Sequence, residues 1–260
     1  MSKLLDVLDK IKDGAPTPLG FSVKRPEKLP GMALIGLVSK DHAKGVGIVT
    51  DEGLDALNLG SSGDPKDIRA LTDGLDGQPW GVRVAGLSRD DAQVYQENGS
   101  DALVFSIEGT SASALVNDEL ARFLCVDPNM DDKELRAVSS LPIDGFVMPL
   151  TQGNDGLTLG DLASVGSVSR RSDKYIVLEV EKPIEGKDLE ALRDIGVHGL
   201  LVDIDLMGIN NLKALKTALL EMPKPTFKRR DRPIAILPGS VFAPPEEPEP
   251  HEDEEEEGDE

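Results

Sequence analysis

The feature that most constrains the fold is the stretch 175–208, which reads YIVLEVEKPIEGKDLEALRDIGVHGLLVDIDLMG. An apolar run from Tyr175 to Val180 is followed by a polar turn and a helical pattern over Lys187 to Ile195. A second apolar run then extends from Gly199 to Ile204. Short apolar runs joined by an amphipathic segment are typical of two parallel strands with a crossover helix. The stretch therefore predicts one β-α-β unit.

The same order of elements recurs along most of the chain, with run centres roughly 20 to 30 residues apart, the length of a strand, loop and helix together. The apolar runs are Ala33–Val38, Leu57–Gly60, Trp80–Ala85, Ala102–Ile107, Phe123–Val126, Gly145–Leu150, Tyr175–Val180 and Gly199–Ile204. The helical patterns are Pro65–Leu75, Arg89–Asn98, Ser113–Arg122, Asp131–Ser140, Leu159–Arg170, Lys187–Ile195 and Asn211–Glu221.

Strand and helix alternating in this way predict an α/β fold, and eight strands favour a single closed (β/α)8 TIM barrel. A doubly wound open parallel sheet is the alternative, because it has the same local order of elements. No helical pattern lies between Lys40 and Asp55, so the first crossover is expected to be degenerate. Aromatic residues make up only 3% of the chain. The core must therefore be built from Val, Leu, Ile and Ala, which suit strands buried on both faces.

Composition divides the chain into four segments. Residues 1–31 hold an amphipathic helix, Ser2 to Lys12, and a proline-rich lead-in; the helix is expected to cover the bottom of the barrel or a partner subunit. Residues 32–223 form the barrel, and 224–240 are a basic and apolar extension. Residues 241–260 hold eleven acidic residues, too polar to bury a core, and are expected to be disordered.

The charge and the cysteine count exclude several classes of protein. The net charge is −20, of which −9 remains for the chain before residue 241, and an acidic protein repels nucleic-acid phosphates. A single cysteine, Cys125, excludes an internal disulfide framework, and its place in the run FLCVDP predicts an inert core residue. No run of about 18 apolar residues is present, and the N-terminus lacks the apolar core of a secretory signal. We therefore expect a cytoplasmic protein.

The segment DLEALRDIGVHGLLVDI resembles the last helix and strand of the aldolase-type TIM-barrel superfamily, which includes the ribulose-phosphate-binding barrels and their flavin-binding relatives. The resemblance covers about residues 32–222 and rests on pattern. It implies glycine-rich phosphate-binding turns after the seventh and eighth strands. Here those turns read Glu179-Val180-Glu181-Lys182 and Asp203-Ile204-Asp205, which repel a phosphate. The usual phosphate motif is therefore absent, and flavin is disfavoured as a cofactor.

In a barrel of this kind the C-terminal ends of the strands carry the chemistry. Carboxylates follow or end four of the predicted strands. Two carboxylates with different pKa values can act as a general acid and a general base, so the catalytic candidates are Glu108, Asp127, Glu179 and Asp203. Glu179 and Asp205 are the candidate ligands for a divalent metal such as Mg²⁺, which prefers oxygen atoms. The alternative is that these carboxylates cap the helices that follow the strands.

Two further features predict substrate binding. Arg83 lies within an apolar run, so it is expected to point into the barrel and to need a carboxylate partner, either Glu108 or Asp127. That pair is either a structural lock or a clamp for a substrate anion. The segment Ser61-Ser62-Gly63 lies before a helix N-terminus, where backbone N–H groups can bind an anion.

Two functions remain open. The first is a barrel that binds a small anionic or metal-chelated metabolite at the strand ends, with the reaction unknown. The second is a non-catalytic barrel that acts as an interaction or assembly component. In that case the N-terminal helix and residues 224–260 contact a protein partner, and the protein is an oligomer or part of one. The sequence leaves open whether the protein is an enzyme.

Overall fold

The computed structural model describes residues 2–13, 28–38, 53–60, 72, 75, 77–116, 119–153 and 156–223. The chain divides into two compact units, Met1–Lys224 and Pro225–Glu260, and the described residues all belong to the first. The predicted degenerate crossover, most of the predicted helix Pro65–Leu75, and the extension and acidic tail over 224–260 lie outside the described residues.

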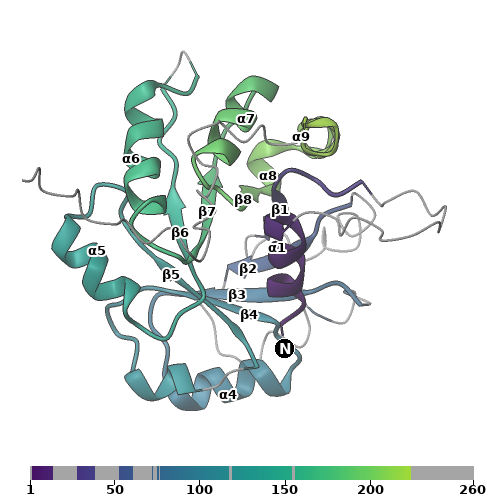
Figure 1. Ribbon diagram of the computed structural model, residues 1–260. Helices are drawn as coiled ribbons and strands as arrows, with labels where there is room; N and C mark the ends of the chain where they lie inside the picture. Colours follow the sequence, from purple (N-terminus) through teal and green to yellow (C-terminus); the bar gives the residue numbers. More distant parts are fainter. Residues whose placement is uncertain are drawn as a thin grey trace, which may run out of the picture. The chain divides into compact units, whose positions relative to one another are not determined.

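Parallel strands close into a barrel that follows the order of the sequence from β1 to β8 (Figure 1). The ring is completed where β8 pairs with β1. The predicted (β/α)8 barrel is therefore confirmed, and the open sheet is excluded because an open sheet has unpaired edges. The strands are β1 (Ala33–Val38), β2 (Ala56–Gly60), β3 (Trp80–Val84), β4 (Ala102–Phe105), β5 (Ala121–Cys125), β6 (Gly145–Pro149), β7 (Tyr175–Val180) and β8 (Gly199–Asp203).

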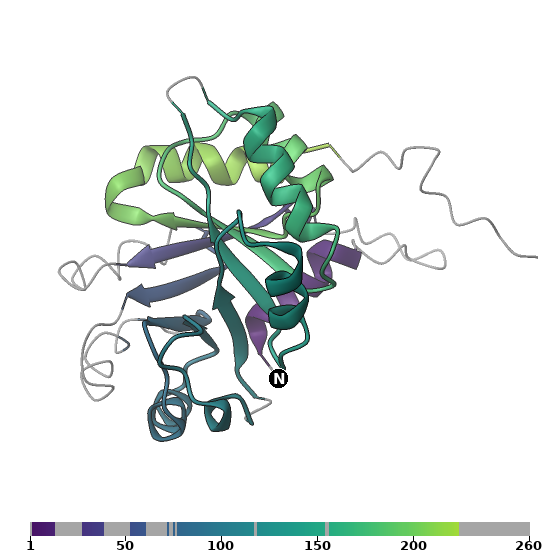
Figure 2. The same cartoon turned by 90° about the vertical axis from the view of Figure 1, so that its left-hand side faces the viewer.

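The helices lie outside the strands, apart from α1 (Figures 1 and 2). They are α1 (Lys3–Asp13), α4 (Arg89–Glu97), α5 (Asp132–Ser139), α6 (Leu159–Ser169), α7 (Gly186–Asp194), α8 (Ile204–Met207) and α9 (Ile209–Glu221), with a 3₁₀ helix η4 (Ala112–Val116). Local signals fix several ends. Ser88 caps α4 by accepting from the Asp91 N–H, and Gly99 ends it at φ +87°, a left-handed conformation that favours glycine. None of the described helices is both long and apolar enough to span a bilayer.

Two predicted elements are wrong. The helix expected over Ser113–Arg122 is only η4, because Ala121 already pairs with Ala102 on β4 and too few residues remain for a longer helix. Ile204 does not extend the last strand but begins α8. The Asp203 carboxylate accepts hydrogen bonds from the N–H groups of Asp205 and Leu206, and this cap starts a helix at Ile204.

The core has two parts because each strand is buried on both faces. The larger part joins outward strand residues, such as Leu103 and Phe146, to helix residues such as Leu135 and Leu189. The smaller part fills the barrel interior, where Val104, Phe123, Val147, Val177 and Leu201 meet. Period-two alternation along each strand sends one set of side chains to each part.

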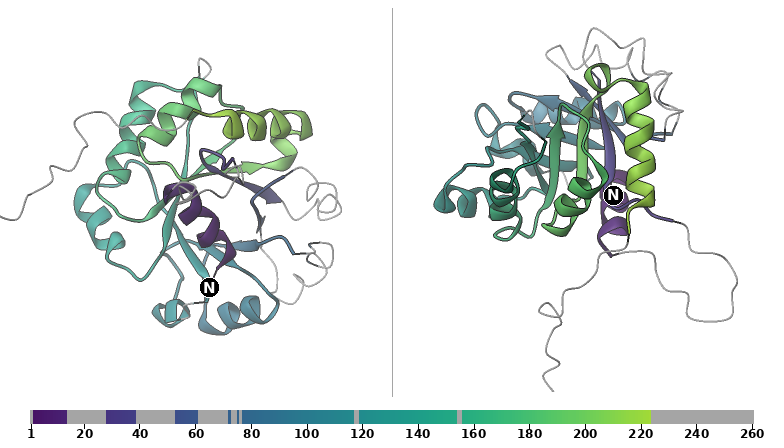
Figure 3. Two further views of the ribbon diagram at one scale, coloured as in Figure 1. Left: turned by 45° about the vertical axis from the view of Figure 1, so that its right-hand side comes forward. Right: turned by 90° about the horizontal axis from the view of Figure 1, so that it is seen from above.

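At the N-terminal end of the barrel, called the base, seven of the eight strands have a small inward residue and β7 has Tyr175. The seven small residues are called the base ring. The members of this base ring are Ala33, Ala56, Gly81, Ala102, Ala121, Gly145 and Gly199. Alanine and glycine alone cannot fill the end of an eight-strand barrel, whose interior is normally packed with larger side chains. Leu4 and Leu8 of α1 supply that volume and are 5% and 0% exposed. Helix α1 accordingly lies across the base (Figure 3).

Polar contacts hold α1 at both ends. Asp101, just before β4, accepts hydrogen bonds from Ser2 Oγ at 2.7 Å and from the Leu4 N–H at 2.8 Å. A carboxylate at a helix N-terminus satisfies otherwise unpaired N–H groups and favours the helix dipole. Further along α1, the Tyr175 hydroxyl donates to Asp9. The apolar face of α1 is therefore used within this chain.

A residue-level repeat links every second strand. The residue before each even-numbered strand carries a side-chain acceptor, and these residues are Asp55, Asp101, Asp144 and His198. Three of them accept from a backbone N–H of the preceding strand: Asp55 from Leu34 at 2.8 Å, Asp144 from Arg122 at 2.8 Å, and His198 from Ile176 at 3.1 Å. Asp101 instead accepts from α1. The residue before an even-numbered strand thus bonds to the preceding strand at β2, β6 and β8, and to α1 at β4.

Candidate functional site

The most distinctive polar contact in the barrel joins Arg83 of β3 to Glu179 of β7. Arg83 Nη1 lies 2.7 Å from Glu179 Oε1. Three strands separate β3 from β7 on each side of the closed ring, so the pair spans the barrel. Both residues lie near the C-terminal ends of their strands, at the opening called the mouth. Their side chains keep 33% and 25% of their surface exposed, so the pair is accessible from the mouth.

The electrostatics of the pair favour its charged form. Burial alone would lower the pKa of the Arg83 guanidinium, but the hydrogen bond and negative charge of Glu179 outweigh burial and raise that pKa above its ordinary value. Cys125, at the end of β5, interacts with the same guanidinium. Burial raises the pKa of the Cys125 thiol, although the positive charge of Arg83 acts in the opposite direction. A thiol with a raised pKa is a poor nucleophile, in keeping with the predicted inert residue.

Arg83 points into the barrel as predicted, but the predicted partner is wrong. Glu108 and Asp127 were the expected partners, and the structure pairs Arg83 with Glu179 instead. Glu108 and Asp127 are both exposed, just beyond the ends of their strands, and too far along the loops to reach the interior positions. Inward alternation on β7 is the sequence signal that identifies Glu179, since it stands two residues after the buried Val177.

The remaining predicted carboxylates make local contacts with the backbone. Asp203 Oδ1 accepts from the N–H of Asp205 at 2.9 Å and of Leu206 at 3.1 Å, which caps α8. Asp127 Oδ1 accepts from the Asn129 N–H at 2.8 Å in the turn after β5. The Asp203 contact matches the capping alternative, whereas Asp127 is exposed in a turn and the cap of α5 is Asp131. Of the predicted catalytic carboxylates, Glu179 alone is brought together with Arg83 by a described contact.

The described residues hold no cluster of metal-ligating side chains. No group of three His, Cys, Asp or Glu side chains in those ranges is arranged to hold a metal ion. Glu179 is engaged by Arg83, and the other predicted ligand, Asp205, is exposed on α8. The predicted anion-binding segment Ser61-Ser62-Gly63 lies outside the described residues.

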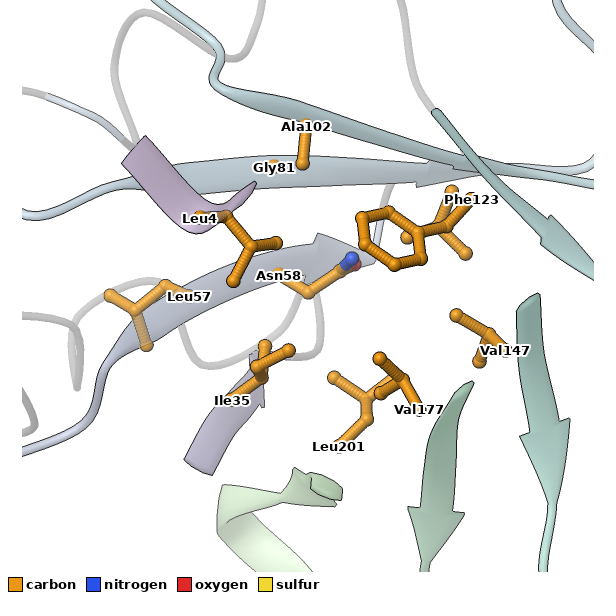
Figure 4. Close-up of a pocket in the computed structure, with 11 residues that line it drawn as sticks. Leu4, Ile35, Leu57, Asn58, Gly81, Ala102, Phe123, Val147, Val177 and Leu201 are labelled. Carbon is orange, nitrogen blue, oxygen red and sulfur yellow. The ribbon is translucent and has the colours of Figure 1, made fainter. Parts of the chain in front are cut away.

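A small cavity lies in the barrel interior below the pair (Figure 4). It measures about 20 Å³, enough for one water molecule, and its lining includes Gly81, Val177 and Leu4. Asn58, on β2, projects into it and is only 4% exposed. Among the described residues, none donates a hydrogen bond to Asn58 Oδ1. Sequence reasoning missed this residue, although a lone amide at an inward position of a strand is a detectable signal.

Comparisons with known proteins give the class of fold. No protein-family model matches the chain. No curated protein matches it either. Solved structures do match: tryptophan synthase from M. tuberculosis in an open form is 15% identical, with a TM-score of 0.61, over 85% of this chain and 98% of that one.

Two further structures show the same likeness. A protein from Aquifex aeolicus VF5, described only as a structural study, is 14% identical, with a TM-score of 0.59, over 84% of this chain and 99% of that one. A mutant tryptophan synthase alpha-subunit from Pyrococcus furiosus is 13% identical, with a TM-score of 0.54, over 73% of this chain and 97% of that one. The chain therefore shares the TIM-barrel fold of these tryptophan synthase structures. At these identities the likeness shows the fold alone.

Proposed function

We propose that this barrel binds a small metabolite at its mouth and that Arg83 pairs with an anionic group of that metabolite. The observation that supports the proposal is the Arg83–Glu179 pair, which spans the barrel and stays partly exposed. Arginine binds carboxylates and phosphates through a planar fork of N–H donors. Glu179 occupies one donor, Nη1, in the contact that the structure shows.

The location of the pair also supports binding rather than a purely structural lock. Ligands of (β/α)8 barrels bind at the C-terminal ends of the strands. Solvent-exposed ion pairs contribute about 1 kcal/mol or less to stability, and the partial exposure of Arg83 and Glu179 moves this pair toward that limit. The named activity of the tryptophan synthases does not enter this proposal, because only the fold is shared.

The alternative, a non-catalytic interaction component, loses one of its two proposed contacts. Leu4 and Leu8 of α1 are buried against the base ring, so this face of α1 is covered within the chain. The other proposed contact, residues 224–260, lies outside the described part of the protein. The mouth therefore offers the better supported function.

The test is thermal denaturation of the full chain with a panel of carboxylates and inorganic phosphate. We expect at least one anion to raise the midpoint of the wild type and not of Arg83→Gln, because a ligand stabilises only the state that binds it. Lys182→Gln is the matched control, since Lys182 is an exposed cation on the same rim. An equal shift in Arg83→Gln, or no shift with any anion, would contradict the proposal.

A further inference from the structure

The Arg83–Glu179 pair has unused hydrogen-bonding capacity on both sides. One atom of each group makes the contact, Nη1 with Oε1 at 2.7 Å. A guanidinium carries five N–H donors, and a carboxylate has two acceptor oxygens. An anion that took Arg83 for itself would leave the Glu179 carboxylate beside a second negative charge. A ligand fits the pair better if it supplies a partner to each group.

The charges around the mouth point the same way. Acidic residues follow the described strands at the rim: Glu108, Asp127, Glu181, Asp203 and Asp205. Lys182 lies among them. Among the described rim residues negative charge exceeds positive charge, which repels a dianion and favours a ligand whose own charges cancel. A free phosphate or dicarboxylate is therefore disfavoured compared with a neutral, bipolar molecule.

The cavity beneath the pair adds an independent observation. Gly81 and Val177 line it, and they stand two residues before Arg83 and Glu179 on the same inward faces of β3 and β7. Asn58 Oδ1, which is buried and has no partner, therefore lies one inward layer below the pair. A buried acceptor without a partner is rare and costly, and it requires a donor. The interior below the pair thus holds an acceptor that one water molecule in the cavity can satisfy.

We infer that the ligand is a zwitterion of the α-amino-acid type. Its carboxylate binds the Arg83 guanidinium and its ammonium group donates to Glu179. The inference rests on the proposed function and names the ligand class for the same site. The two charged groups of an α-amino acid are attached to one carbon atom, which suits two protein charges whose nearest atoms are 2.7 Å apart. Asn58 Oδ1 accepts its donor from a water molecule in the cavity.

The experiment is calorimetric titration of the full chain with the twenty L-α-amino acids. The deaminated acids and decarboxylated amines of the same side chains serve as matched probes. We expect one or more amino acids to bind about tenfold more tightly than either of their matched probes, because each lost charged hydrogen bond costs about that factor. Glu179→Gln removes the negative charge with little change of shape, so this variant should lose the preference for the amine-bearing ligand. Arg83→Lys keeps the positive charge but loses the planar fork of N–H donors. This variant should therefore bind both the amino acids and the deaminated acids more weakly.

The outcomes separate this inference from the proposed function. If deaminated acids bind as tightly as the amino acids and binding still depends on Arg83, the zwitterion is excluded and the anion site stands. If the preference survives in Glu179→Gln, the ammonium does not bind there and the inference is also overturned. If no probe binds, or if binding ignores every substitution at Arg83, both proposals fail. Circular dichroism of each variant confirms that its fold is intact.

Discussion

Replacing Leu8 by alanine tests whether α1 is part of the barrel core. Leu8 is 0% exposed and packs where the base ring offers only alanine and glycine side chains. Replacing a buried leucine by alanine lowers the free energy of unfolding by about 2 to 5 kcal/mol. The loss is larger where the neighbouring residues cannot move to fill the cavity. Strands fixed by ladder hydrogen bonds on both sides cannot move inward to fill the space. We therefore expect Leu8→Ala to lower the free energy of unfolding by about 3 to 4 kcal/mol.

Urea denaturation followed by tryptophan fluorescence measures this loss. The chain has one tryptophan, Trp80, which is 6% exposed at the start of β3 and so reports on the barrel itself. Leu5→Ala is the matched control, because Leu5 lies on the same helix but is only partly buried, and it should cost about 1 kcal/mol. A loss below about 1 kcal/mol for Leu8→Ala would refute the argument that α1 completes the base.

Three further predictions concern single residues. Asn58→Leu should raise the free energy of unfolding by about 1 to 2 kcal/mol in the same urea assay, because an orphan acceptor is removed and the cavity takes the larger side chain; a loss would mean that the amide has a partner. Burial and the charge of Lys12 lower the pKa of His198 to about 4, so the unfolded chain binds a proton that the folded chain excludes. Stability should therefore fall by up to about 3 kcal/mol between pH 6.5 and pH 4, and His198→Asn, which keeps an acceptor for the Ile176 N–H, should remove that part of the pH dependence; an unchanged slope would contradict the shift. Asp203→Ala should cost about 1 kcal/mol as a lost helix cap and leave ligand binding unchanged, and loss of binding would return Asp203 to the site.

The sequence predicted the barrel because the fold depends on a pattern that many residues share. Apolar runs at regular spacing define parallel strands whatever their individual residues, and the described strands fall within one or two residues of the expected ones. The helix expected over Ser113–Arg122 failed because strand pairing, a non-local contact, decided where β5 begins. Local helical periodicity carries no information on that pairing.

The candidate site was only partly predictable. Inward alternation correctly pointed Arg83 into the barrel, but choosing its partner needs the diameter and stagger of the closed ring. Glu179 lies 96 residues away in the sequence. Alternation along β7 turns it inward, but no local pattern shows that it, rather than Glu108 or Asp127, reaches Arg83. The role of Asp203 could not be predicted either. A carboxylate at the end of a strand can cap the next helix or contact a ligand, and the surrounding sequence is the same in both cases.

The sequence did not decide what α1 covers, because its apolar face could pack against the base of the barrel or against a partner subunit. The small residues of the base ring are the signal that decides it, because alanine or glycine at the first inward position of strand after strand leaves space that a separate element must fill. Individually each alanine is unremarkable. The pattern becomes visible only once the staggered strands close into a barrel and bring these residues to the same end.

Nuclear magnetic resonance of the Arg83 guanidinium shows whether this residue binds the ligand at the mouth. The Arg83 Nε–H signal is assigned by its absence from Arg83→Lys, and the full chain is then titrated with the tightest-binding amino acid of the calorimetric panel. We expect a saturable shift of the Arg83 signal, with the same dissociation constant as the heat of binding, because the ligand carboxylate accepts from guanidinium N–H donors that the contact with Glu179 does not use. An Arg83 signal that stays fixed while the ligand binds and shifts signals elsewhere would contradict it.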